Sequence, residues 1–176
     1  MKVIFLDIDG VLNSHSWNAK NQNEISRGQL IDESAVKLLV RIVYETNAVI
    51  VLHSGWRFWF DAMMNPLREE ARHLINVLQQ NGLKIYDITP DLTTDEIRKT
   101  GKFSLVKAQE ILLWIERNEN LEGYVVLDDM ELGHDRINNR LILINADTGI
   151  SEDDVCRAVA ILKNNLCECN NTVHKC

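Results

Sequence analysis

Short apolar runs rich in branched residues recur along this chain at positions 3–8, 48–52, 83–88, 124–127 and 141–144. Runs of this length are typical of strands that are buried on both faces of a parallel sheet. Other stretches repeat apolar residues every three or four positions, which predicts helices that begin near Asp32, Pro66, Ser104 and Ser151. This alternation predicts a three-layer α/β/α sandwich around a five-stranded, Rossmann-like parallel sheet.

Two polar segments show neither the repeat of a helix nor that of a strand. Residues 14–31 are interpreted as a flap-like excursion over the carboxyl edge of the sheet, and residues 89–102 as a loop. The helix that begins at Pro66 is expected to end at Asn81-Gly82 and to bury one stripe of residues: Leu67, Ala71, Leu74, Ile75 and Leu78. We expect one domain over residues 1–165 and a flexible tail over 166–176.

The first strand runs directly into two acids, Asp7 and Asp9, followed by Gly10. An unpaired carboxylate inside a sheet is costly, so both acids should lie where the strand leaves the sheet. Ligands of open α/β sheets bind at that edge. Two carboxylates this close favour a cation between them, and hard oxygen ligands suit Mg²⁺. The alternative is that the acids only cap a turn.

Polar residues follow two further strands. Ser54 comes after the second strand, and Asp128 and Asp129 come after the fourth. Parallel strands end at one edge, so these residues should meet Asp7 and Asp9 if the three strands are neighbours. Packing alone does not require polar groups at this edge, so a functional site is favoured. The alternatives are that Ser54 is only a hydroxyl at the start of a loop and that Asp128 and Asp129 only form an acidic turn.

Composition narrows the function classes only mildly. The 176 residues carry a formal net charge of -7, which argues against an extended nucleic-acid surface. No apolar run approaches the ~18 residues that span a bilayer, and the amino terminus does not resemble a signal peptide. A cytoplasmic protein is therefore expected. Three tail cysteines are interpreted as reduced thiols rather than a metal clip with His174, because no C-x-x-C pair is present: Cys167, Cys169 and Cys176.

Four motifs resemble one branch of the haloacid-dehalogenase-like (HAD) hydrolases. They are D-I-D-G-V-L-N over residues 7–13, S-G-W-R over 54–57, a basic residue before E-I-L-L-W over 110–114, and L-D-D over 127–129. The chain is most similar to the HAD domain of the Swiss Army Knife RNA-repair proteins. The resemblance implies strand order 5-4-1-2-3 and a capless, Mg²⁺-dependent phosphatase.

The resemblance also implies roles for the acids. Asp7 corresponds to the nucleophile that forms an aspartyl-phosphate, and Asp9 to the general acid and base, whose backbone carbonyl also binds the metal. Asp128 and Asp129 correspond to the remaining ligands of Mg²⁺. The implied metal set is therefore Asp7, Asp9, Asp128 and Asp129.

The expected phosphate-binding residues are Ser54, Gly55, Arg57 and Lys107. Lys107 fits the cationic motif best, with Lys102 as the alternative, although a helix lysine can also be merely solvated. The Arg57 guanidinium suits phosphate, and it could equally pair with a structural carboxylate.

Aromatic residues cluster after the second strand. Core packing is favoured over stacking against a nucleobase for Trp56, Phe58, Trp59 and Phe60. His53 is interpreted as a strand-end histidine with its hydrogen bonds satisfied rather than as a ligand.

The leading hypothesis is a phosphomonoester hydrolase that acts on a nucleotide, a polynucleotide end or another phosphoester. Two alternatives use the same residues: a module that binds a phosphorylated ligand without turnover, and a phosphotransferase to an acceptor other than water. The oligomeric state stays open.

Overall fold

The computed structural model describes residues 1–101 and 103–163. Its centre is a five-stranded parallel sheet in the order β3-β2-β1-β4-β5. The strands are β1 (Lys2–Leu6), β2 (Val49–Leu52), β3 (Ile85–Ile88), β4 (Gly123–Asp128) and β5 (Leu141–Leu143). This order confirms the one implied by the resemblance, because 5-4-1-2-3 is the same order read from the opposite edge.

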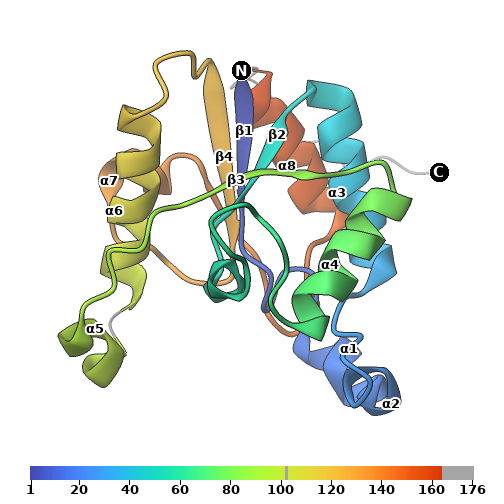
Figure 1. Ribbon diagram of the computed structural model, residues 1–176. Coiled ribbons are helices and arrows are strands. Elements are labelled where there is room, and N and C mark those ends of the chain that lie inside the picture. Colours follow the sequence, from blue (N-terminus) through green and yellow to red (C-terminus); the bar gives the residue numbers. More distant parts are fainter. Residues whose placement is uncertain (102, 164–176) are drawn as a thin grey trace.

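Helices cover both faces of the sheet (Figure 1). One face carries α3 (Glu33–Thr46), α4 (Glu69–Gln80) and α8 (Glu152–Leu162), and the other carries α6 (Phe103–Glu116) and α7 (Asp135–Asn138). The predicted three-layer sandwich is thus confirmed. Within the described residues the excursions hold only short helices, so no separately folded cap covers the sheet.

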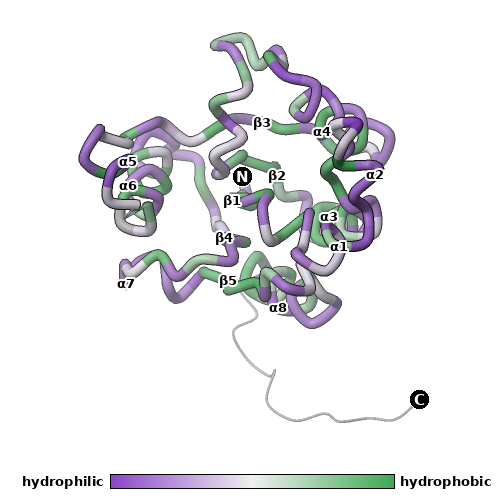
Figure 2. The backbone as a smooth tube through the Cα atoms, turned by 90° about the horizontal axis from the view of Figure 1, so that it is seen from below, coloured by the Kyte–Doolittle hydropathy of each residue, from purple (hydrophilic) through white to green (hydrophobic). Residues whose placement is uncertain are grey.

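Strand β1 shows how the sequence builds the two layers. Ile4 and Leu6 pack with α3, α4 and α8, whereas Val3 and Phe5 pack with α6 and α7. This alternation follows from the two-residue repeat of a strand. Phe5 also meets Trp114 of α6 edge to face, with 5.3 Å between ring centroids. Figure 2 looks onto the carboxyl edge, with the hydrophobic strands at its centre and α5 and α6 on one side.

The strand register aligns the carboxyl ends of β1, β2 and β4. Leu6 of β1 pairs with Leu52 of β2 and with Leu127 of β4. The backbone N–H of Asp7 extends the ladder by donating to the carbonyl of Leu127 (2.9 Å). The three strands therefore end at one level, and the residues that follow them lie side by side.

Three segments that lack a periodic pattern nevertheless form short helices. The excursion holds α1 (His15–Lys20) and α2 (Gln22–Ile25), the second strand leads into η1 (Gly55–Trp59), and the loop after β3 holds α5 (Asp95–Thr100). Side-chain caps start three of them, because Ser14, Ser54 and Thr94 accept backbone N–H groups. Helices of four to six residues are too short to show a repeating apolar stripe, so the sequence pattern does not predict them.

The prediction for the helix after Pro66 was wrong at its start. That helix, α4, begins at Glu69, because residues 60 and 66 form an antiparallel bridge and the Leu67 N–H donates to the carbonyl of Trp59 (2.7 Å). Leu67 is consequently exposed and does not belong to the buried stripe. Ala71 and Leu74 are buried as expected.

Several expectations fall on residues outside the described ranges, namely the alternative cation Lys102 and the tail 164–176 with its three cysteines and His174. The remaining cysteine, Cys156, is a free and exposed thiol. Among the described residues, no helix is long and apolar enough to cross a bilayer.

Candidate active site

Asp7 lies at the carboxyl end of β1, almost completely buried. Its Oδ1 accepts the N–H of Ile8 (2.8 Å), and its Oδ2 accepts from Nζ of Lys107 (2.8 Å). Lys107 reaches over from α6 and also lies 2.5 Å from Oδ2 of Asp128. The end of β1 and the end of β4 are thus linked by one buried ammonium.

Three acids gather around this lysine. Asp7, Asp128 and Asp129 each offer a carboxylate oxygen, and these oxygens lie within 4.8 Å of one another. Burial, followed by the charge of Asp7, raises the pKa of Asp128 to about 7 and also raises the pKa of Asp129. Lys107 therefore does not fully offset the acids. An additional cation would stabilise their ionised forms, and a cluster of carboxylate oxygens fits Mg²⁺.

Gly10 makes room for this cluster. Its φ is +75°, and a Cβ on it would lie 2.5 Å from Oδ2 of Asp129. A side chain is thus excluded both by the backbone conformation and by the neighbouring acid. The first and last motifs therefore contact each other at a position where only glycine fits.

The Asp9 carboxylate is not one of the three in this cluster, and the ligand role that the resemblance implies for Asp9 belongs to its backbone carbonyl instead. The carboxylate is exposed and accepts two neutral donors, Nδ2 of Asn13 (2.8 Å) and Nε1 of Trp56 (3.0 Å). Asn13 also accepts the N–H of Gly10 through Oδ1 (3.1 Å). Sequence reasoning missed that Asn13 and Trp56 orient Asp9, although both stand in the recognised motifs.

Ser54 is fully buried at the end of β2. Its Oγ accepts the N–H of Trp56 (3.3 Å), which leaves the hydroxyl proton able to donate. Gly55 lies beside it, and a Cβ there would meet no atom within 4 Å. Both residues line the same cavity as Asp7 and Asp9.

Arg57 pairs with a structural carboxylate, one of the two interpretations left open by the sequence. Its Nη2 donates to Oε1 of Glu110 (2.7 Å), and its Nη1 donates to the carbonyl of Ser54 (3.1 Å). The same Glu110 oxygen accepts the N–H of Leu92 (2.9 Å). Glu110 is completely buried, and that burial is the main cause that raises its pKa. This one carboxylate joins η1, α6 and the loop before α5.

The four residues of the aromatic cluster lie in two different environments. Trp56 and Phe60 are buried in the core and Trp59 packs against it, which confirms core packing for these three. Phe58 differs, because it is 44% exposed and lines the site cavity. His53 is fully buried, with Nδ1 3.3 Å from Oγ1 of Thr89.

The other His53 nitrogen, Nε2, lies 4.0 Å from Asp128 and forms no hydrogen bond with the described residues. Only one of its two nitrogens is therefore satisfied. Burial, reinforced by Lys107 and Arg57, holds the pKa of His53 well below its ordinary value. The ring is consequently neutral.

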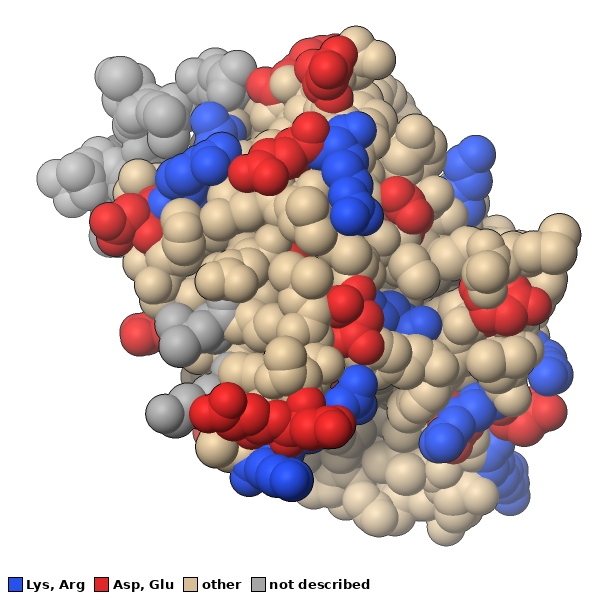
Figure 3. Space-filling model, turned by 60° about the vertical axis from the view of Figure 1, so that its left-hand side comes forward, with Lys and Arg blue, Asp and Glu red and all other residues tan. Residues whose placement is uncertain are grey.

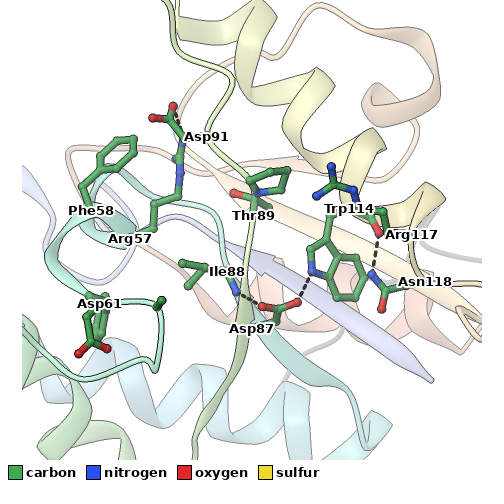
Figure 4. A pocket seen from close by; sticks show the side chains of 13 residues that line it. Arg57, Phe58, Asp61, Asp87, Ile88, Thr89, Asp91, Trp114, Arg117 and Asn118 are labelled. Carbon is green, nitrogen blue, oxygen red and sulfur yellow. Dashed lines mark hydrogen bonds and ion pairs between the residues drawn. The ribbon is translucent and has the colours of Figure 1, made fainter.

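The site opens into a cavity of about 430 Å³, formed by the ends of β1 and β2, η1, α6 and α5. A second cavity of about 530 Å³ lies next to it, and both cavities are lined by Arg57 and Phe58. Figure 4 shows the second cavity, with Phe58, Arg57 and Asp91 at one end and Trp114, Arg117 and Asn118 at the other. The Trp114 indole is fixed there by Asp87 (2.7 Å).

Comparison with known families agrees with this geometry. Residues 3–155 match the family described as the HAD domain in Swiss Army Knife RNA repair proteins. No curated protein and no solved structure matches the chain. The match includes all five strands except the first residue of β1, and every strand end that contributes to the site. On the motifs, the strand order and this match, the chain belongs to the family of HAD domains found in Swiss Army Knife RNA repair proteins.

Proposed function

We propose that this protein is a Mg²⁺-dependent phosphatase that hydrolyses a phosphomonoester through an aspartyl-phosphate on Asp7. The observation that carries the proposal is the cluster of Asp7, Asp128 and Asp129 around Lys107, next to a cavity large enough for a phosphate ester. Asp128 and Asp129 would hold Mg²⁺ together with Asp7. The bound ion would offset negative charge on the transferred phosphoryl group.

In the first step, Oδ of Asp7 attacks phosphorus while the ester P–O bond breaks, and Asp9 gives its proton to the departing oxygen. In the second step, Asp9 takes a proton from water, the water oxygen attacks phosphorus, and the bond to Asp7 breaks to release inorganic phosphate. Lys107 keeps Asp7 ionised and stabilises charge on the phosphoryl oxygens. Ser54 and the backbone at Gly55 donate to those oxygens.

We place the substrate among nucleotides and polynucleotide ends. The family description names RNA repair, which supports this assignment. The site is reached without a cap, so a long substrate can enter. On the face shown in Figure 3, acidic and basic side chains are interspersed, which favours recognition of a chain end over binding along an extended basic surface.

Phosphate release from a panel of esters, with and without Mg²⁺, tests the reaction. Asp7→Asn should lower kcat at least about 1,000-fold, because the amide cannot act as the nucleophile. Asp135→Asn, an exposed acid on α7, is the matched control and should retain wild-type activity. Acid-quenched protein should carry a phosphoryl group on Asp7. Full activity of Asp7→Asn would refute the mechanism.

The same assay separates the two alternatives. A module without turnover would bind a phosphorylated ligand but release no phosphate in Mg²⁺. A phosphotransferase would release less phosphate than it consumes ester, and the difference would appear on an added acceptor alcohol. Equal amounts of ester consumed and phosphate released are expected.

A further inference from the structure

Among the described residues, three cations line the site cavity: Arg57, Arg98 and Lys107. Two of them already have buried carboxylate partners. Lys107 lies between Asp7 and Asp128, and Arg57 is paired with Glu110 at 2.7 Å. Their positive charge is largely offset before a substrate arrives.

Arg98 of α5 is different. Its only ion pair among the described residues is with Asp91, at 3.5 Å, and the two side chains are 54% and 39% exposed. Exposed pairs of this kind contribute little to stability, so solvent and ligands compete with them easily. A phosphate accepts two parallel hydrogen bonds from a guanidinium, which an ion pair at 3.5 Å does not supply. Arg98 is therefore available to an anionic ligand.

Phe58 lies next to this arginine. The Arg98 guanidinium carbon is 5.8 Å from the ring centroid, and that of Arg57 is 4.5 Å from it. Phe103 and Met130, which line the same cavity, are also exposed large apolar residues. Apolar side chains gathered at one cavity mark a surface that a ligand covers. The most accessible ring among them, Phe58, suits stacking against a planar ring.

The segment that carries Arg98 is tied to the buried pair of Arg57 and Glu110 beside the cavity. The Leu92 N–H donates to Glu110, the same carboxylate that holds Arg57, and Asp91 lies 3.9 Å from Arg57. The segment before α5 is thus anchored next to the cavity, and the exposed Arg98 side chain lines that cavity. Arg98, which has no buried carboxylate partner, and the exposed ring of Phe58 are therefore distinct from the residues proposed to react.

We propose that Phe58 and Arg98 select the leaving group, with Phe58 stacking on a nucleobase and Arg98 binding a second phosphate of the same nucleotide. The substrate class would be nucleotides with a phosphate beyond the one removed, such as a nucleoside bisphosphate or an oligonucleotide end. This inference rests on the proposed phosphatase function and assigns specificity to residues outside its catalytic set.

Steady-state kinetics on three esters test the assignment: a nucleoside 3′,5′-bisphosphate, the matching monophosphate, and glycerol phosphate, which has no ring. Arg98→Ala should raise KM for the bisphosphate about 10-fold, the value of one charge-assisted contact, and KM for the monophosphate less than about 2-fold. Phe58→Leu should raise KM about 5-fold for both nucleotides but not for glycerol phosphate. Asp91→Asn removes the competing carboxylate and should lower KM for the bisphosphate.

Arg117→Ala is the matched control, because this exposed arginine lines the second cavity instead. Equal effects of Arg98→Ala on all three esters would overturn the proposal. So would a KM increase for the bisphosphate in Arg117→Ala but not in Arg98→Ala. If no ester is hydrolysed, the phosphatase function fails. In that case, calorimetry of bisphosphate binding to Asp7→Asn, with and without Arg98→Ala, still tests the inference. Binding about 10-fold weaker with Arg98→Ala is expected, and equal affinities of the two proteins would refute the inference.

Discussion

The inner and outer halves of the site use the same type of ion pair in opposite environments. In the inner half, Lys107 contacts Asp7 and Asp128, and all three residues are at least nine-tenths buried. In the outer half, Arg98 contacts Asp91, and both are substantially exposed. Removing one partner of a buried pair costs about 3–5 kcal/mol, whereas an exposed pair contributes about 0–1 kcal/mol. The inner half is therefore fixed by the fold, and the outer half can rearrange around a ligand.

The largest expected effect comes from breaking the inner half. Lys107→Met removes the cation between Asp7 and Asp128, so the two carboxylates repel each other and Asp7 loses its charge partner. We expect kcat to fall about 100- to 1,000-fold, the loss typical of a group that stabilises transition-state charge. Single-turnover phosphate release in Mg²⁺ measures it.

Lys102→Met provides the comparison, because Lys102 is the other candidate for the same motif. We expect its kcat to stay within about 3-fold of the wild type, the change typical of a substitution outside the chemistry. If Lys102→Met were the inactive variant and Lys107→Met the active one, the assignment of the catalytic cation would be wrong.

Stability should separate two carboxylates that lie near the same arginine. Glu110→Gln leaves the buried Arg57 without its charge partner, and we expect the free energy of unfolding to drop by about 3 kcal/mol. Asp91→Asn affects only exposed or distant pairs and should cost less than about 1 kcal/mol. Urea unfolding of both variants measures the difference, and equal losses would show that burial does not distinguish these pairs.

The contrast between the halves also explains what the sequence could predict. All five strands were predicted, because each is rich in branched apolar residues, and the acids at the ends of the first and fourth strands stood out against those residues. Lys107 was chosen as the candidate cation from its place before the E-I-L-L-W motif. These features depend on residues that are close in the chain.

The contacts that were missed join residues far apart in the chain. Glu110 lies 53 positions from Arg57, and Trp56 lies 47 positions from Asp9. No local pattern can predict such pairs, because the packing of segments that are distant in the chain brings them together. The short helix α5, which carries Arg98, was also missed, since six residues capped by Thr94 give no amphipathic period.

The smallest expected effect concerns His53, a neutral ring beside the inner cations. Burial, Lys107 and Arg57 lower its pKa well below its ordinary value of 6.5, so the folded protein excludes a proton that the unfolded chain binds. The contribution of His53 to stability is thus fully present above pH 6.5 and is lost as the pH falls below that value. The expected loss is about 1.4 kcal/mol per pH unit until the folded pKa is reached.

His53→Asn isolates this contribution, because the amide is close in position to Nδ1 and can keep the hydrogen bond to Thr89. Urea unfolding between pH 5 and pH 8 should show a shallower acid slope for His53→Asn than for the wild type. Ser16→Ala changes an exposed side chain that does not titrate, and it should retain the wild-type slope. An unchanged slope in His53→Asn would mean that this ring takes up its proton without unfolding, which a closed inner half does not permit.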